Sequence, residues 1–93
     1  MYATVRSYSG ESDLVDSLVA HEADVREIFD AIPGFRAYYL IRTAEGATTV
    51  SVFDDQAGAE ESTRAAAAWV AENLGDGAPA PPQVTTGEVA VSF

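Results

Sequence analysis

The chain has 93 residues, the length of a single domain, and 47% of them are hydrophobic, an ordinary fraction for a globular protein. Fifteen acidic and five basic residues give a net charge of −10, which repels nucleic acid and anionic membranes, so we exclude both as partners. The sequence has no cysteine and no apolar run long enough to span a membrane. We therefore expect one cytoplasmic domain over residues 1–93.

The first third of the chain predicts a strand followed by a helix. Residues 2–8 alternate in the manner of a strand and end before a serine–glycine break. Ser12 can cap a helix through its hydroxyl. From there as far as Ile32, apolar residues recur every three or four positions, which predicts one unbroken amphipathic helix. Pro33 and Gly34 end this helix.

Three further strands are predicted at residues 35–42, 47–53 and 84–93. A short loop containing a glycine separates the first two of them, as is typical of a hairpin. Asp54 or Asp55 caps a second helix that runs to about Leu74, and a proline-rich, extended connector at 77–82 follows. This order predicts an α+β fold of the ferredoxin-like βαββαβ type, with a four-stranded antiparallel sheet.

The predicted strands give the sheet two different faces. One face is apolar and includes Phe35, Tyr39 and Ile41 of the second strand and Val50 and Val52 of the third. The other face mixes aromatic, small polar and arginine side chains, which indicates a pocket or a wet interface on that side. A short chain buries little surface, so a second copy is the simplest cover for an apolar face that the helices leave open.

Two motifs carry a resemblance to a known family: Gly34-Phe35-x-x-Tyr38 opening the second strand, and Thr49-Val50-Ser51-Val52-Phe53-Asp54 leading into the second helix. With the order of elements, they resemble the dimeric α+β barrel superfamily, and within it the antibiotic-biosynthesis-monooxygenase-like (ABM-like) domains. The resemblance implies a homodimer in which two ferredoxin-like subunits pair sheet to sheet into a barrel. It also implies a pocket between the sheet and the helices of each subunit. Enzymes of this family include cofactor-independent oxygenases of aromatic polyketides and haem-degrading monooxygenases.

The chain departs from the catalytic pattern of the enzymes that it resembles. The haem-degrading members use an asparagine on the first strand, a tryptophan in the second helix and a histidine near the end of that helix. Here the first strand offers Thr4 and Arg6, the only asparagine is Asn73, and the only histidine is His21 in the first helix. Trp69 falls about two turns later than the tryptophan of the family. No catalytic role is carried over to this chain, and no cofactor is expected.

Five side chains are candidates for a ligand site: Tyr38, Trp69, His21, Arg36 and Tyr8. Tyr38 and Tyr8 either form an aromatic box with a hydroxyl donor or pair with aromatic neighbours across strands. Trp69 either gates a pocket by stacking or packs against the proline connector or a dimer mate. His21 is either a general base or an iron ligand that faces the pocket, or a partly buried residue hydrogen-bonded to a carboxylate or carbonyl.

The arginines and the acidic pairs also have more than one possible role. Arg6 and Arg36 are expected on the less apolar face, and a buried arginine needs a partner. In a chain this acidic we expect pairing with an internal carboxylate across the dimer, with an anionic ligand as the alternative. The acidic pairs at 54–55 and 60–61 begin the second helix, where they complement its dipole, so no metal site is expected.

Two functions are left open by these observations. The first is a small dimeric barrel that binds a small aromatic or hydrophobic molecule between sheet and helices, without the usual catalytic residues of the family. The alternative is a cofactor-independent monooxygenase acting on an aromatic or quinone-like substrate. Such an enzyme needs a base or an amide that forms and holds a substrate anion beside oxygen. The sequence indicates neither the ligand, nor the pathway, nor any assembly beyond the dimer.

Overall fold

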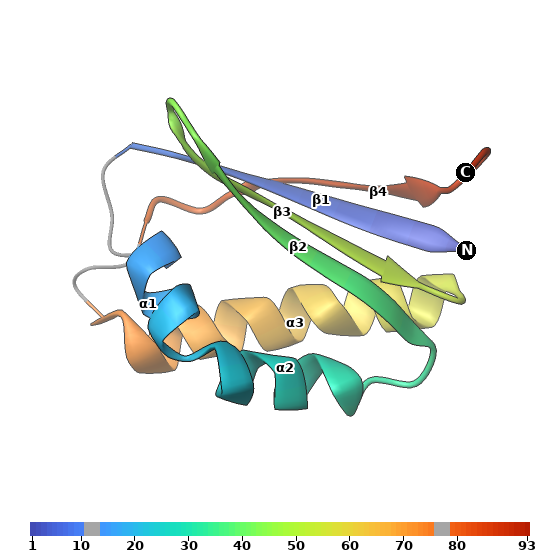
Figure 1. Ribbon diagram of the computed structural model, residues 1–93, viewed down its shortest axis with the longest axis horizontal. Helices are drawn as coiled ribbons and strands as arrows, with labels where there is room; N and C mark the ends of the chain where they lie inside the picture. The colour runs from blue at the N-terminus through green and yellow to red at the C-terminus, as the bar shows by residue number, and fades with distance from the viewer. Residues whose placement is uncertain (11–13, 76–78) are drawn as a thin grey trace.

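A computed structural model describes residues 1–10, 14–75 and 79–93 of the chain. The strands are β1 (Tyr2–Ser9), β2 (Phe35–Thr43), β3 (Gly46–Phe53) and β4 (Gln83–Glu88), and the helices are α1 (Leu14–Ala20), α2 (Glu22–Asp30) and α3 (Gln56–Asn73). The strands form one antiparallel sheet in the order β2-β3-β1-β4. All three helices lie against one face of this sheet (Figure 1). The ferredoxin-like α+β fold is therefore confirmed.

The helix predicted to run unbroken to Ile32 is instead two helices that meet at His21. Backbone bonding continues through the joint, because the His21 N–H donates to the Ser17 carbonyl at 3.0 Å and the Val25 N–H donates to the His21 carbonyl at 3.0 Å. The Nδ1–H of His21 donates to the same Ser17 carbonyl at 2.9 Å. A side chain that inserts into the helical ladder in this way is a recognised cause of kinks. Ser12, the predicted cap, lies outside the described residues.

The helix predicted between the third and fourth strands, α3, begins and ends as predicted. Asp55 is its N-cap, and α3 follows from Gln56 to Asn73. At the other end the Leu74 N–H donates to the Val70 carbonyl at 3.0 Å. Gly75 has a φ of +50°, the left-handed conformation in which glycine commonly ends a helix. At its start α3 packs closely on the sheet, since a β-carbon on Gly58 would lie 3.0 Å from the Phe53 ring.

A bulge at the start of β2 changes which side chains face the helices. The register with β3 shifts between Phe35 and Ala37, so that Phe35 pairs with Phe53. The Phe35 ring therefore lies on the helix-covered face, with its centroid 5.6 Å from that of Phe53 and 6.0 Å from that of Phe29. The prediction that Phe35 shares the apolar face with the later residues of its strand is wrong, because the extra residue of a bulge reverses the alternation.

The two faces of the sheet differ as predicted, and the helices cover the semi-polar one. Arg6 and Thr49 pair across β1 and β3 on this face, and both are buried. The register places apolar side chains together on the opposite face: Ala3, Val5, Ala37, Tyr39, Ile41, Val50 and Val52. No described helix covers them, and Tyr39 and Ile41 are 59% and 45% exposed. Pairing of this face with a second copy stays a prediction.

The last strand is shorter than predicted. β4 ends at Glu88, which pairs with Tyr2, the first residue of β1. The Val89 N–H donates to the Met1 carbonyl at 2.8 Å, and residues 90–93 extend past β1 without a neighbouring strand. The predicted connector at 77–82 begins outside the described residues. No helix in the described ranges is long and apolar enough to cross a membrane, and the cytoplasmic location stays a prediction.

Candidate functional site

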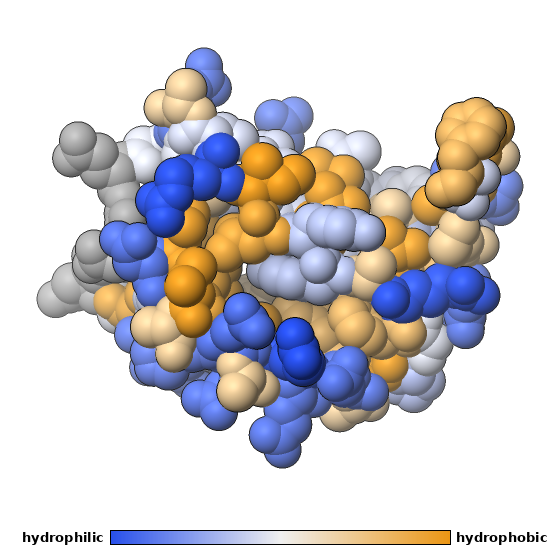
Figure 2. Space-filling model, in the orientation of Figure 1, coloured by the Kyte–Doolittle hydropathy of each residue, from blue (hydrophilic) through white to orange (hydrophobic). Residues whose placement is uncertain are grey.

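A groove lies between α2 and the edge strand β2. Its volume is about 750 Å³, inside the range of roughly 300–1,000 Å³ that is usual for small-molecule sites. Apolar side chains of α1, α2 and β2 line it: Leu18, Val25, Phe29, Phe35, Tyr38 and Leu40. Exposed charged side chains border it: Glu22, Arg26, Asp30 and Arg36. Figure 2 shows this side of the molecule, with apolar side chains gathered between the positions of β2 and α2.

Three aromatic rings form the floor of the groove. The Phe29 centroid, on α2, is 4.8 Å from that of Tyr38 and 6.0 Å from that of Phe35, both on β2. These distances are typical of offset or tilted ring pairs, which hold one another in place. The bulge in β2 creates this cluster, because it turns Phe35 toward the helices. The floor is therefore suited to a flat apolar or aromatic molecule.

Arg6 is buried between the sheet and α3, on the inner strand β1, and is only 2% exposed. Its guanidinium donates three hydrogen bonds, all to hydroxyls: Nη1 to Ser51 at 3.1 Å, and Nη2 to Ser62 at 2.7 Å and to Thr63 at 3.1 Å. In the described ranges no carboxylate pairs with it. No described carboxylate of the same chain supplies the expected ion pair, because every described Asp and Glu is exposed and Arg6 is not. Pairing with a carboxylate across the dimer stays a prediction.

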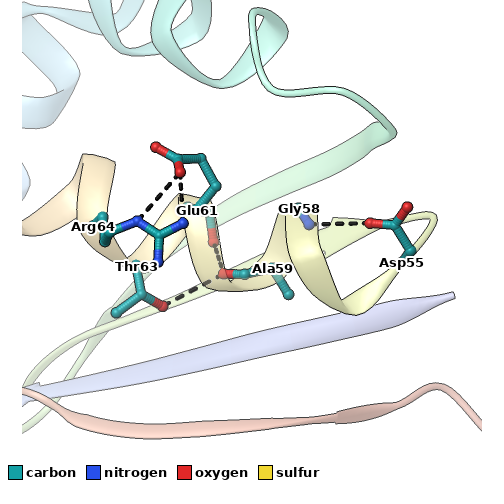
Figure 3. A network of polar contacts seen from close by, with 7 residues as sticks. Asp55, Gly58, Ala59, Glu61, Thr63 and Arg64 are labelled. Atoms are coloured by element: carbon teal, nitrogen blue, oxygen red, sulfur yellow. Dashed lines mark hydrogen bonds and ion pairs between the residues drawn. The ribbon is translucent and has the colours of Figure 1, made fainter.

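The hydroxyls of Ser62 and Thr63 connect Arg6 to the backbone of α3. Both accept from Arg6 and donate to the Ala59 carbonyl, at 2.6 Å from Ser62 and 3.5 Å from Thr63. Figure 3 shows the contact from Thr63 to Ala59 on the helix, near the Asp55 cap. Because the hydroxyl hydrogens point to the carbonyl, the oxygen lone pairs are free to face the guanidinium. The first turns of α3 thus hold Arg6 in one position.

Two buried polar atoms in this region have no hydrogen-bond partner among the described residues: Arg6 Nε and Thr49 Oγ1. The two residues lie directly opposite each other on neighbouring strands, so their side chains share one face of the sheet. Both line a cavity of about 20 Å³, enough for one oxygen atom. Buried polar groups without partners are rare and costly in native proteins, so this pair of atoms calls for an explanation.

Two tyrosines flank the same cavity, Tyr8 and Tyr38. The pKa of Tyr38 is raised to about 12, chiefly by burial and also by nearby Tyr8, while the charge of Arg6 opposes the rise. Burial likewise raises the pKa of Tyr8, again against the effect of Arg6. For Arg6 itself burial lowers the pKa, while the two tyrosines raise it. At neutral pH the cavity therefore combines a cation with two protonated phenols.

The structure brings four of the five predicted site residues to the groove and the cavity. Tyr38 lines both, and Tyr8 and Trp69 line the cavity. Arg36 borders the groove at the β2 bulge, where it is exposed. His21 lines neither space. Its expected bond to a carbonyl is confirmed, but it is exposed rather than partly buried, and its ring lies edge-on to Trp69 with centroids 5.9 Å apart.

The sequence predicts a carboxylate partner for Arg36 but does not identify which one, and it does not predict the hydroxyl cluster. Arg36 pairs through Nε with the Asp54 carboxylate, which the β2 bulge and the start of α3 bring together. Thr49 and Ser51 were not predicted as site residues. Their alternation with Val50 places them on the semi-polar face, but only the register of β3 against β1 puts them beside an arginine.

The described side chains give little support for a metal or a haem. No group of three or more His, Asp and Glu side chains in the described ranges could hold a metal ion. The histidine that the sequence offers, His21, lines neither the groove nor the cavity, so a haem iron has no histidine ligand there. No step of the proposals below involves a haem.

The sequence matches no known family profile and no curated protein. Solved structures similar to the whole chain include the haem degrader MhuD of Mycobacterium tuberculosis with two haems in its active site (14% identity, 100% of this chain and 99% of that chain, TM-score 0.72). A second is a putative antibiotic biosynthesis monooxygenase from Bordetella bronchiseptica (18% identity, 97% of this chain and 97% of that chain, TM-score 0.71). A third is a monooxygenase from the gene ActVA-Orf6 of Streptomyces coelicolor in complex with nanaomycin D (13% identity, 99% of this chain and 89% of that chain, TM-score 0.66). At these identities the likeness establishes the fold, and at that level it confirms the resemblance to ABM-like proteins.

Proposed function

We propose that the protein binds a small aromatic molecule in the groove between α2 and β2. The observation that carries this proposal is the floor of the groove, where the Phe29 ring lies 4.8 Å from that of Tyr38 and 6.0 Å from that of Phe35. A cleft of about 750 Å³ that combines apolar and aromatic side chains with polar groups at its border is a usual form of a small-molecule site. The fold supports the proposal, since similar structures contain haem or nanaomycin D.

A ligand-observed NMR screen tests this proposal with a panel of aromatic molecules and aliphatic molecules of similar size. We expect saturation transfer to the aromatic members only. Val19, on α1, lines the groove and is 61% exposed, so Val19→Trp fills the space without disturbing the core. The matched control is Ala71→Trp, at an exposed position of α3 that lines no described pocket. Binding that survives Val19→Trp as well as Ala71→Trp would place the ligand elsewhere.

The binding unit, in this proposal, is a homodimer joined through the apolar face of the sheet. Apolar side chains of β1, β2 and β3 form one continuous patch there, which includes Val5, Tyr39 and Val50. Monomeric proteins seldom leave so extended an apolar face in water. The exposed side chains of Val91 and Phe93 add apolar surface beyond the end of β4. A second copy, face to face, covers these side chains and completes a barrel.

The alternative function is a cofactor-independent monooxygenase for an aromatic or quinone-like substrate. The arrangement in its favour is the pair of Arg6 and Tyr38 at one cavity, because a cation and a phenol donor can stabilise a substrate anion. The amide expected of such enzymes is not at this cavity: Asn73 instead donates to the Trp69 carbonyl at 2.9 Å. Oxygen uptake with an anthrone tests the alternative. Turnover lost in Tyr38→Phe would support it, and no uptake across a broad aromatic panel would refute it.

A further inference from the structure

We propose that the ligand of this groove is an aromatic acid, and that Arg6 Nε and the Thr49 hydroxyl bind its anionic oxygen in the small cavity behind the groove. The inference rests on the proposed function and specifies the ligand class for it. The anionic oxygen belongs either to a carboxylate or to an ionised phenol, and the shared chemistry is a negative oxygen attached to an apolar ring.

The first argument is the charge of Arg6. A buried guanidinium is stable only when its charge is compensated, and the most effective partner is an anion. The partners of Arg6 in the described ranges are Ser51, Ser62 and Thr63, all of them neutral hydroxyls. They hold the two Nη groups in place but supply no negative charge. An anionic ligand supplies the charge that the described residues do not.

The second argument is the position of the unpartnered atoms. Arg6 Nε can only donate a hydrogen bond, and the Thr49 hydroxyl can donate a second one. The two side chains lie opposite each other on β1 and β3 and line one cavity. A single oxygen that accepts from both satisfies both atoms at once. A negative oxygen does so better than a water molecule, because it also neutralises the guanidinium.

The third argument is the size of the two spaces and the residues that they share. A cavity of about 20 Å³ takes one oxygen atom and excludes a ring. The ring must therefore lie in the apolar space next to it. Four residues line both the cavity and the large groove: Leu18, Val25, Phe29 and Tyr38. A molecule with its ring against Phe29 and Tyr38 can direct an oxygen between these side chains toward Arg6.

Because of the net charge of the protein, the salt dependence of acid binding distinguishes a buried site from an exposed one. A net charge of −10 repels anions at long range, so general electrostatic attraction cannot account for acid binding here. Added salt screens this repulsion but hardly affects a buried contact. We therefore expect the affinity for the acid to hold or rise with ionic strength. An anion bound at an exposed arginine would be released instead.

The experiment is equilibrium dialysis of the full chain against matched acid and neutral probes at pH 7: 2-naphthoate with its methyl ester, and 4-nitrophenolate with 4-nitroanisole. We expect at least one acid to bind about tenfold or more tightly than its neutral partner, the size expected of a charge-assisted hydrogen bond. Arg6→Met should abolish this preference and leave ester binding unchanged. The matched control is Arg26→Met, an exposed arginine at the groove border, which should retain the preference.

Thr49→Val keeps the test decisive if Arg6→Met fails to fold. It removes a hydroxyl that has no partner among the described residues, so the variant should fold. It should bind the acid several-fold more weakly while binding the ester normally. Unchanged acid binding in Thr49→Val, or equal binding of acid and ester by the unmodified protein, would overturn the inference and leave the proposed function standing. If neither member of either pair binds, the proposed function itself fails.

Discussion

Ser62→Ala tests whether the hydroxyl cluster holds Arg6 in place. The change removes the shortest bond to the guanidinium, 2.7 Å from Nη2, at a residue with no exposed surface. Water cannot enter to replace it, and a buried hydrogen bond to a charged group contributes about 1.5–3 kcal/mol. The free energy of unfolding should therefore fall by about 2 kcal/mol, which lowers the melting temperature of a domain of this size by about 8–16 °C.

Thr63→Ala is the matched control, one residue further along α3. Its hydroxyl also accepts from Arg6, at 3.1 Å, but the residue is only partly buried and solvent can take its place. We expect a loss below about 1 kcal/mol. The assay is urea unfolding at pH 7, followed by the fluorescence of Trp69 at one protein concentration, because a dimer gains stability with concentration. Equal losses for Ser62→Ala and Thr63→Ala would refute the account of how Arg6 is held.

Three further predictions address the tyrosine, the dimer and the histidine. The folded-state pKa of Tyr38, about 12, lies above its ordinary value of 10.0, so its stabilisation is complete below pH 10 and is lost as pH rises through 12. Between these pH values the free energy of unfolding, measured by urea titration, should fall by about 2 kcal/mol less in Tyr38→Phe than in the unmodified protein. An equal fall in the two proteins would contradict the burial of the phenol. Tyr39→Glu should give a monomer in native mass spectrometry, while Ala44→Glu in the hairpin loop stays a dimer, and a dimer in both would exclude the apolar face as the interface. His21→Ala should leave ligand affinity unchanged in dialysis, because His21 lines neither space, and a tenfold loss would mean that the site is placed wrongly.

The fold could be predicted because its signals are local. Asp55 and Gly75 limit α3 through their own chemistry, one as a carboxylate acceptor and the other as a left-handed glycine. A few adjacent residues likewise determine the hairpin turn before Gly46 and the alternation of β3. The bulge at Phe35 was not predictable in this way, because it depends on how β2 aligns with β3 and leaves no mark in the alternation itself.

The site was predictable only in part. The sequence places Arg6, Tyr8 and Tyr38 on the semi-polar face, since this follows from alternation within each strand. It does not place Thr49 beside Arg6, because that neighbourhood depends on the register between β1 and β3. For a similar reason the sequence does not show that no described carboxylate reaches Arg6. Composition counts the carboxylates of the chain, but it does not show that the described ones all lie at the surface.

The measurement that tests the central claim most directly is NMR of the Arg6 Nε–Hε group in the full chain, assigned by comparison with Arg6→Met. This group reports on the atom that we expect the acid to contact. We predict that its resonance shifts when 2-naphthoate is added and does not shift with the methyl ester, while the Nε–Hε signal of the groove-border Arg26 stays the same with both. An Arg6 signal that is unmoved by a bound acid would contradict the account.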